Sequence, residues 1–270
     1  MQGIEGTEYH RFHLTVLLRT PAKVAISAAL LAASFFASSC GSTKTRPTIA
    51  VASNFNAAAE EIAARFEKKT GNKVNLVFGS TGKTYAQIKN GAPYDAFLAA
   101  DSAHPRLLED EGIALKNSRI TYAYGRLVLW GPEHNLNDGG RILANDEFNR
   151  LAIANPKLAP YGAAAIEVLA ASGLDANQLG RRLIRGENVA QVFQFVKTGN
   201  VEYGFVAYSQ IIQDKEIDPS SVWTVPGNLY TAIEQQGVLL TQNQTAREFM
   251  IFLNSPEALE VIRRYGYGTP

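Results

Sequence analysis

The sequence has few of the residues on which disulfides, metal clusters and catalytic centres depend. It contains one cysteine in 270 residues, Cys40, which excludes an internal disulfide and any cysteine-based metal cluster. Beyond the first forty residues it has two histidines, His104 and His134, and neither lies in a motif with a nucleophile. A hydrolase needs a base with an orienting partner, and the sequence offers none. We therefore expect no enzyme, no cofactor and no bound metal ion.

The sequence also lacks an excess of charge of either sign. It has 26 basic and 25 acidic residues, which gives a formal net charge of +1. A balanced chain gives no reason to expect a nucleic acid or an acidic polymer as partner. With 46% hydrophobic residues, the chain is long enough for two modest lobes or for one large α/β domain.

The longest apolar run lies near the amino terminus. Arg11, Arg19 and Lys23 precede VAISAALLAASFFASSCGS, which is rich in alanine and serine. A positive segment followed by a short apolar one resembles a bacterial export signal. The run is too short and too rich in alanine to be a convincing permanent membrane span. We expect a protein of the periplasm or of the outer face of the cytoplasmic membrane.

The single cysteine ends this run. The sequence ASSC resembles a lipoprotein processing site, after which Cys40 would carry lipid. A plain secretory signal cleaved nearby and an uncleaved anchor are the alternatives. We assign residues 1–40 to the signal and residues 41–47 to a polar tether.

The stretch GSTGKT, which begins at Gly79, suggests a nucleotide-binding loop, but its spacing is wrong. A phosphate loop of that class needs a glycine five positions before the Gly-Lys pair, so that enough N–H groups surround the phosphates. That position is Val77. A nucleoside triphosphatase is therefore the least favoured function. What remains is a strand, a tight turn and a helix start, with Ser80 and Thr81 either capping the helix or binding an anion there.

From Thr48 onward, apolar strand patterns alternate with amphipathic helix patterns. The helix pattern of residues 56–71 is closed by Gly71, and residues 201–211 form a strand pattern. The alternating order favours mostly parallel sheets with helices on both faces. Two long extended runs, 119–131 and 221–241, interrupt the alternation. Two α/β units joined by long strands predict two lobes with a hinge of crossing strands. We expect residues 48–124 and 228–270 in lobe 1 and residues 125–227 in lobe 2.

Four strand-to-helix loops share one character, and open α/β sheets bind ligands at such loops. Short polar groups and free backbone N–H donors occur in each of them. The loops contain no arginine or histidine, and Lys83 is their only lysine. Neutral donors and helix dipoles suit a small oxyanion that has lost its water. The loops are VASNF with Ser53 and Asn54, GSTGK with Ser80 and Thr81, APYG with Tyr161, and GENVAQ with Asn188 and Val189.

These residues resemble the periplasmic molybdate-binding proteins of ABC importers, which are two-lobed substrate-binding proteins. The resemblance extends from Thr48 to Tyr267. Its markers are VASNF, GSTGKTYAQIKNGAPYDAFLAAD, YGRLVLW, ANPKLAPYG, GENVAQ, GFVAYSQI and RRYGY. It implies capture of molybdate, with tungstate as a near-isostere, and delivery to the membrane subunits of an ABC transporter. We expect a monomer.

The resemblance also implies the binding residues. On lobe 1 they are Ser53, Asn54, Ser80 and Thr81, and on lobe 2 they are Tyr161 and Val189, the last through its backbone N–H. One branch of the family brings a later tyrosine to the anion. Here Ala207 stands at that position and Tyr208 follows it, and we expect Tyr208 to face elsewhere, because a shift of one residue reverses the side of a strand. The Tyr161 hydroxyl is a candidate substitute.

Two alternatives remain open at this point. The first is a binding protein for another oxyanion or small solute. Amino-acid binders pair the ligand with an arginine and a carboxylate, and the four loops lack both unless Glu187 enters the cleft. The second is a metal pair at Asp95 and Asp101, although these residues more simply serve the ends of a strand and the cap of the next helix, near His104.

Overall fold

The computed structural model describes residues 46–212 and 214–270. The predictions for the export signal, for most of the tether and for Cys40 lie outside the described residues. Residues Thr45–Pro270 form one compact unit. Within the described part, no helix combines the length and the apolar character that crossing a bilayer requires.

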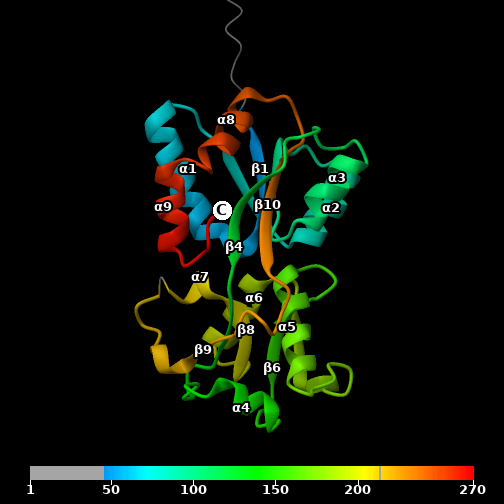
Figure 1. Cartoon of the computed structure of the whole chain (residues 1–270), viewed down its shortest axis with the longest axis vertical. Coiled ribbons are helices and arrows are strands. Elements are labelled where there is room, and N and C mark those ends of the chain that lie inside the picture. Colours follow the sequence, from blue (N-terminus) through cyan, green and yellow to red (C-terminus); the bar gives the residue numbers. More distant parts are fainter. Residues whose placement is uncertain (1–45, 213) are drawn as a thin grey trace, which may run out of the picture. The chain divides into compact units, whose positions relative to one another are not determined.

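Lobe 1 is built on a five-stranded sheet of order β2-β1-β3-β10-β4 (Figure 1). Its strands are β1 (Thr48–Ala52), β2 (Asn75–Gly79), β3 (Ala96–Leu98), β4 (Ile120–Gly125) and β10 (Ile233–Leu239). Its helices are α1 (Asn56–Thr70), α2 (Thr81–Lys89), α3 (Ala103–Asp110), α8 (Gln244–Phe252) and α9 (Pro256–Arg264), and the turn η1 (Ser53–Phe55) joins β1 to α1.

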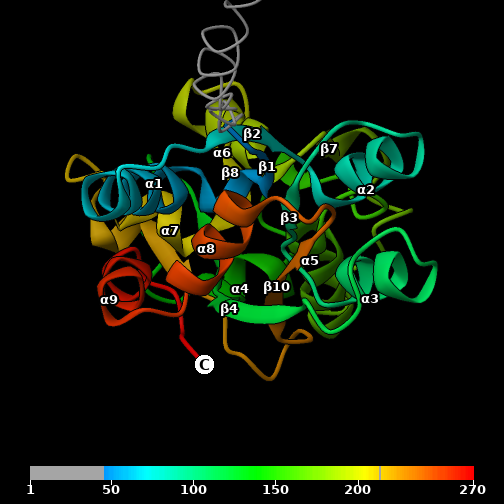
Figure 2. The ribbon, with the colours of Figure 1, turned by 90° about the horizontal axis from the view of Figure 1, so that it is seen from above.

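The helices cover both faces of this sheet. Figure 2 shows α1 and α9 on one side of it and α2 and α3 on the other. One core lies under α1, α8 and α9, where Phe66 meets the rings of Phe249 and Phe252. A smaller core around Phe97 and Leu108 lies under α2 and α3. The predicted layering of lobe 1 is confirmed.

Helix α1 illustrates how the sequence pattern determines an element. Its buried side chains include Ala59, Ile62 and Phe66, which recur at the three- and four-residue spacing of one helix face. Gly71 ends the helix in the left-handed conformation, at φ 71°, and its N–H donates to the Glu67 carbonyl. Glycine adopts that conformation without strain, so the prediction that Gly71 closes this helix is confirmed.

Lobe 2 has a second five-stranded sheet, of order β7-β6-β8-β5-β9. Its strands are β5 (Leu127–Trp130), β6 (Leu151–Ala154), β7 (Leu183–Gly186), β8 (Tyr203–Ala207) and β9 (Val222–Thr224). Helices α5 (Pro160–Ala171) and α6 (Val189–Lys197) pack on it. The short helices and turns are α4 (Gly139–Ala144), α7 (Tyr208–Ile211), η2 (Gly180–Arg182) and η3 (Pro219–Ser221).

In each sheet one strand runs against the other four. Strand β10 is antiparallel to both of its neighbours in lobe 1, and β5 is antiparallel to both of its neighbours in lobe 2. The remaining strands share one direction in each sheet. The prediction of a two-lobed α/β fold with mostly parallel sheets is therefore confirmed.

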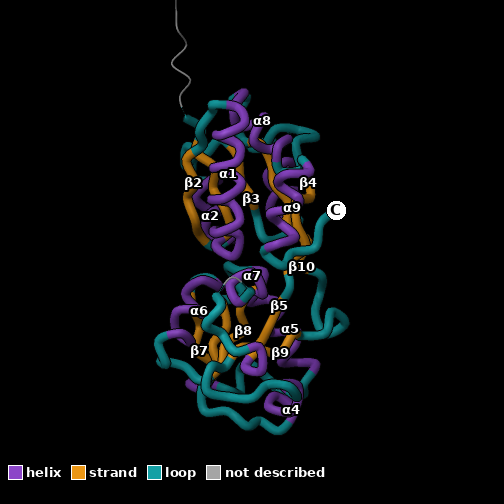
Figure 3. The backbone as a smooth tube through the Cα atoms, turned by 90° about the vertical axis from the view of Figure 1, so that its left-hand side faces the viewer, coloured by secondary structure: helices purple, strands orange, loops and turns teal. Residues whose placement is uncertain are grey.

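The chain crosses between the sheets along two segments (Figure 3). The predicted strand over 119–131 divides at Arg126 into β4 and β5, one in each sheet. The expected return strand over 221–241 is not continuous, because residues 225–232 separate β9 from β10. Pro226 and Gly227 are poor strand formers and account for the break. The two segments are joined where the Leu127 N–H donates to the Tyr230 hydroxyl at 3.2 Å.

Two other expectations are wrong in detail. The predicted strand 201–211 ends at Ala207, and its last residues form α7. The sequence interpretation also missed β7, a strand of four residues with the polar Arg185 in its middle, which is too short to give a strand pattern.

The crossing at Gly125 leaves no room for a side chain. A Cβ atom at this position would lie 2.3 Å from the Tyr161 hydroxyl and 2.9 Å from the Gln235 amide nitrogen. Gly125→Ala should therefore lower the free energy of unfolding by about 1–3 kcal/mol, as expected for overpacking. Urea denaturation followed by circular dichroism measures this change.

Gly227→Ala is the matched control, because Gly227 lies in the other crossing segment and a Cβ there meets nothing within 4 Å. We expect it to change the free energy of unfolding by no more than about 0.5 kcal/mol. Equal denaturation midpoints for the two variants would contradict the packing described for the hinge.

Candidate functional site

The four loops singled out in the sequence line one small cavity. They follow β1 and β2, which are parallel in one sheet, and β6 and β7, which are parallel in the other, and residues of all four loops meet at the cavity. The cavity volume is about 10 Å³, roughly that of one water-sized sphere. Its lining residues are Ala52, Ser53, Asn54, Gly79, Ser80, Thr81, Ala100, Ala159, Pro160, Tyr161, Asn188 and Val189. All six predicted binding residues are among them.

Ser80 is the most informative residue of the cavity. It precedes α2 with an extended backbone, but its side chain makes no capping hydrogen bond. Its hydroxyl is buried and finds no hydrogen-bond partner among the described residues. An unpaired buried hydroxyl costs free energy, so native proteins rarely keep one without a reason. The simpler interpretation of GSTGK as an ordinary helix cap is therefore wrong for Ser80.

Thr81 has a different environment. Its hydroxyl oxygen accepts a hydrogen bond of 3.0 Å from the Ala100 N–H, and both residues are buried. The bond joins the end of β3 to the start of α2 and fixes the threonine rotamer. The hydroxyl proton remains available for donation, because a hydroxyl is both an acceptor and a donor.

Asn54 lines the cavity, and its side-chain amide is held by two other side chains. The amide nitrogen donates to the Gln235 Oε1 at 2.9 Å and to the Tyr267 hydroxyl at 3.2 Å. The Asn54 carbonyl accepts from the hydroxyls of Tyr267 and Ser209, at 2.5 and 3.1 Å. These four bonds fix the peptide planes of the turn after β1.

Backbone N–H groups supply the other donors. Thr81 and Val189 are the first residues of α2 and α6, and Tyr161 is the second residue of α5. The first N–H groups of a helix have no partner within that helix, and its amino end carries partial positive charge. Asn188 acts as a conventional cap, because its side chain accepts from the Gln191 N–H at 3.0 Å. It therefore leaves the Val189 N–H for another partner.

No formal charge enters this lining. None of the described residues that form the cavity is an arginine, lysine or carboxylate. Glu187, whose entry would have argued against an anion, instead pairs with Lys83 at 2.9 Å, and both side chains are about half exposed. The cavity can thus satisfy a small, compact group that accepts hydrogen bonds, and it has no carboxylate to receive an ammonium group.

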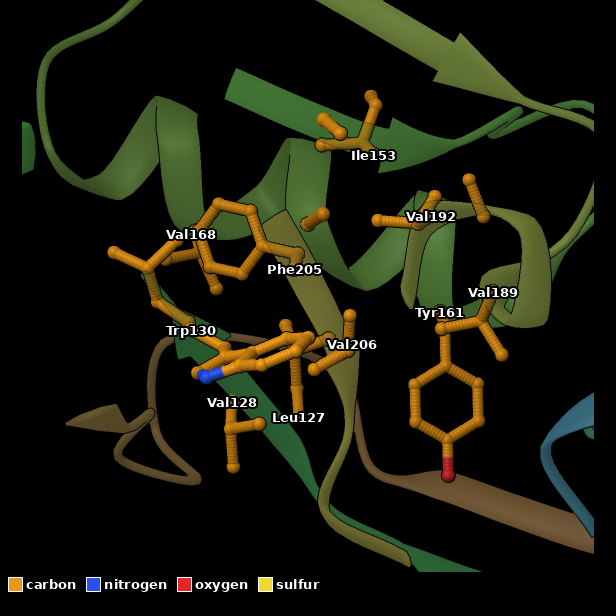
Figure 4. Close-up of a cluster of buried hydrophobic side chains, with 14 of the residues drawn as sticks. Leu127, Val128, Trp130, Ile153, Tyr161, Val168, Val189, Val192, Phe205 and Val206 are labelled. Atoms are coloured by element: carbon orange, nitrogen blue, oxygen red, sulfur yellow. The ribbon is translucent and has the colours of Figure 1, made fainter. Parts of the chain in front are cut away.

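Tyr161 lies in the cavity wall, but its hydroxyl points toward the hinge. The Gln235 amide donates to this hydroxyl at 3.4 Å, and Figure 4 shows the ring reaching away from Val189. Burial raises the pKa of the Tyr161 hydroxyl well above its ordinary value. Burial likewise raises the pKa values of Tyr122 and Tyr267. All three phenols stay protonated, so they place no negative charge near the cavity.

The Gln235 side chain connects Asn54, Tyr122 and Tyr161. The sequence patterns did not identify it. It is fully buried on β10, and its Oε1 accepts from both Asn54 and the Tyr122 hydroxyl, at 2.9 and 3.0 Å. Ser209 and Tyr267 were missed in the same way. The run RRYGY contains Tyr267, yet nothing local in these residues tells which side chain will be buried next to a loop 213 positions away.

The remaining sequence candidates have structural roles. The Asp95 carboxylate accepts from the Thr48 N–H and from the Thr241 hydroxyl, at 2.9 and 2.7 Å. Asp101 accepts from the His104 N–H at 3.0 Å at the start of α3. Across the described part of the chain, no three histidine, cysteine or acidic residues gather into a metal site. Tyr208 lines a separate cavity, as expected, but it does so as the first residue of α7 and not through strand alternation.

Comparisons with known proteins agree with the fold and the site described above. The family model for bacterial extracellular solute-binding proteins matches residues 47–268. The molybdate-binding protein ModA of Azotobacter vinelandii is 47% identical over 91% of this chain and 96% of its own length. ModA of Rhodobacter capsulatus is 45% identical over 82% of this chain and 87% of its own length.

A solved structure agrees with the architecture. The periplasmic molybdate-binding protein of Azotobacter vinelandii superposes with a TM-score of 0.79 at 38% identity, over 83% of this chain and all of that one. Fold, coverage and sequence identity thus agree from the first strand to the last helix. The chain belongs to the bacterial extracellular solute-binding proteins, in the group of the periplasmic molybdate-binding proteins.

Proposed function

We propose that this protein captures molybdate between its two lobes and delivers it to the membrane subunits of an ABC importer. The observation that carries the proposal is a cavity whose described lining residues are all neutral, in which the Ser80 hydroxyl is buried without a partner among the described residues. An oxyanion supplies the acceptor that this hydroxyl lacks. The hydroxyls of Ser53, Ser80 and Thr81 and the N–H groups of Asn54 and Thr81 would hold it from lobe 1. The N–H groups of Tyr161 and Val189 would hold it from lobe 2.

The chemistry of the lining argues for selection among oxyanions. Phosphate keeps a proton near neutral pH and needs an acceptor for it, whereas molybdate, tungstate and sulfate do not. The cavity has no carboxylate, and the Asn188 Oδ1 is occupied by the Gln191 N–H. We propose tungstate as a second ligand because it is a near-isostere of molybdate. Sulfate is smaller and would be held less well.

A binding protein for a larger solute is the weaker candidate. An amino acid needs a basic side chain for its carboxylate and an acidic one for its ammonium group, and neither is among the described residues that line the cavity. Catalysis is not part of the proposal, because the lining offers no nucleophile activated by a base.

The proposal extends to the organisation and location of the chain. We propose residues 48–124 and 228–270 as lobe 1 and residues 125–227 as lobe 2, with the division at the two crossing segments. We further propose a monomer that is exported to the periplasm or to the outer face of the cytoplasmic membrane. Cys40 is the candidate site for a lipid anchor.

Isothermal titration of the purified protein with four oxyanions tests the ligand. We expect one molybdate and one tungstate to bind per chain, and at least tenfold weaker binding of sulfate and of phosphate. The expected order follows from the smaller size of sulfate and from the absence of a carboxylate acceptor for the proton of phosphate among the described lining residues. Tight binding of phosphate together with no response to molybdate would refute the assignment.

Two substitutions separate ligand contacts from structural ones. Ser80→Ala removes a hydroxyl that has no partner in the described part of the chain, so the unfolding midpoint of the anion-free protein should stay the same or rise. Thr81→Val removes the acceptor of a buried N–H and should lower the free energy of unfolding by about 1–3 kcal/mol. Both should weaken molybdate binding about tenfold or more, since hydrogen bonds to charged groups are the stronger ones.

Ser172→Ala serves as the control for these variants. The Ser172 hydroxyl bonds to the Val168 carbonyl at 2.9 Å at the end of α5, away from the cavity. Its loss should leave molybdate affinity unchanged in titration calorimetry. If Ser80→Ala bound molybdate as tightly as the unmodified protein, the buried hydroxyl would not be a ligand contact.

A further inference from the structure

The two lobes touch at the sheet edges that lie farthest from the hinge. Both crossing segments leave the β4 and β10 side of lobe 1 and the β5 and β9 side of lobe 2. Strands β2 and β7 are the opposite edges of the two sheets. Gly82 and Lys83 lie in the first turn of α2, which follows β2, and Glu187 lies in the loop after β7. Leu158 lies in the loop after β6, the strand next to β7.

Two direct contacts join the lobes at this edge. The Gly82 N–H donates to the Leu158 carbonyl of lobe 2 at 2.8 Å, and the two backbones are so close that a Cβ on Gly82 would lie 3.0 Å from the Leu158 Cα. Beside them the Lys83 ammonium lies 2.9 Å from the Glu187 carboxylate. Neither contact uses an atom that the proposed site assigns to the anion.

Their position makes these contacts sensitive to closure. When two bodies rotate about a hinge, the points farthest from the axis move most, so the β2 and β7 edges separate first as the lobes open. A contact made only in the closed arrangement raises the closed fraction and with it the apparent affinity for any ligand held between the lobes. Gly82 follows Thr81 directly, so this contact adjoins the ligand loop.

We propose that Gly82 with Leu158, and Lys83 with Glu187, form a latch that keeps the lobes closed over the anion and sets its rate of release. This inference rests on the proposed function, because it assumes an oxyanion in the cavity. The latch controls how long the anion stays. It has no part in choosing which anion is bound.

Gly82→Ala tests the latch because it should weaken retention of the anion without lowering the stability of the anion-free protein. The added methyl group would lie 3.0 Å from the Leu158 Cα, so Leu158 must move by a few tenths of an ångström and the closed arrangement is disfavoured. In the open arrangement it only replaces glycine in the first turn of α2, where alanine is the better helix former. We expect an unchanged or higher unfolding midpoint without anion, and release of radioactive molybdate into excess unlabelled molybdate that is about tenfold faster or more.

Gly140→Ala is the matched control, because Gly140 is likewise the second residue of a helix, α4, and its Cβ would make only an ordinary contact of 3.5 Å with Trp223. It should leave the release rate unchanged. If the Gly82→Ala variant released molybdate at the same rate as the unmodified protein, the latch would be overturned. A fall in the unfolding midpoint of this variant without anion would overturn it as well, since the contact would then belong to the resting fold.

The charged pair provides an independent measurement. Lys83→Gln and Glu187→Gln each break the latch, so each should speed release by about two- to fivefold at low salt, the range for exposed pairs. If these residues acted only through their charge near the anion, Glu187→Gln would slow release instead. Opposite effects of the two variants would therefore overturn the proposal, whereas an unmodified protein that retained no molybdate would overturn the proposed function itself.

Discussion

A small oxyanion can be taken out of water without a counter-ion only if hydrogen-bond donors meet its oxygens from every side. This requirement accounts for much of the arrangement seen here. Four loops end four strands of two sheets, and each brings hydroxyls or first-turn N–H groups to one cavity. Apart from Tyr161, the described side chains that line it are short, which lets the backbone come close. Lys83 and Glu187, the charges nearest in sequence to these loops, neutralise each other at the rim.

Hydrogen-bond donors stabilise the anion only if they point toward it. Residues on the hinge side of the cavity hold the ligand loops in that orientation. Gln235 on β10 holds the Asn54 amide with one end and the Tyr161 hydroxyl with the other. Tyr267, near the carboxyl terminus, and Ser209 of lobe 2 fix the Asn54 carbonyl. A buried network of this kind is rigid when all its members are satisfied. The residues that orient the ligand loops therefore also lie where the chain crosses between the lobes.

The sequence predicted the elements that depend on local rules. Helix periodicity and Gly71 determined α1, and short polar residues before helices identified all four loops of the cavity. Contacts between distant segments were not predictable in the same way. Gln235 lies in a strand pattern and gains its role from residues more than 70 positions away. Strand β7 was missed because a strand of four residues with a central arginine has no clear periodicity. The hydroxyl of Tyr161 was expected at the anion, yet it bonds to the hinge.

A crystal structure of the protein grown with molybdate tests the central claim most directly, because anomalous scattering locates the molybdenum atom without reference to the protein. The account predicts one strong peak in the cavity, with oxygens within hydrogen-bond distance of the Ser80 and Thr81 hydroxyls and of the Val189 N–H. It also predicts no lysine or arginine in contact with the anion. A molybdenum atom bound elsewhere, or one neutralised by a basic side chain, would contradict the account.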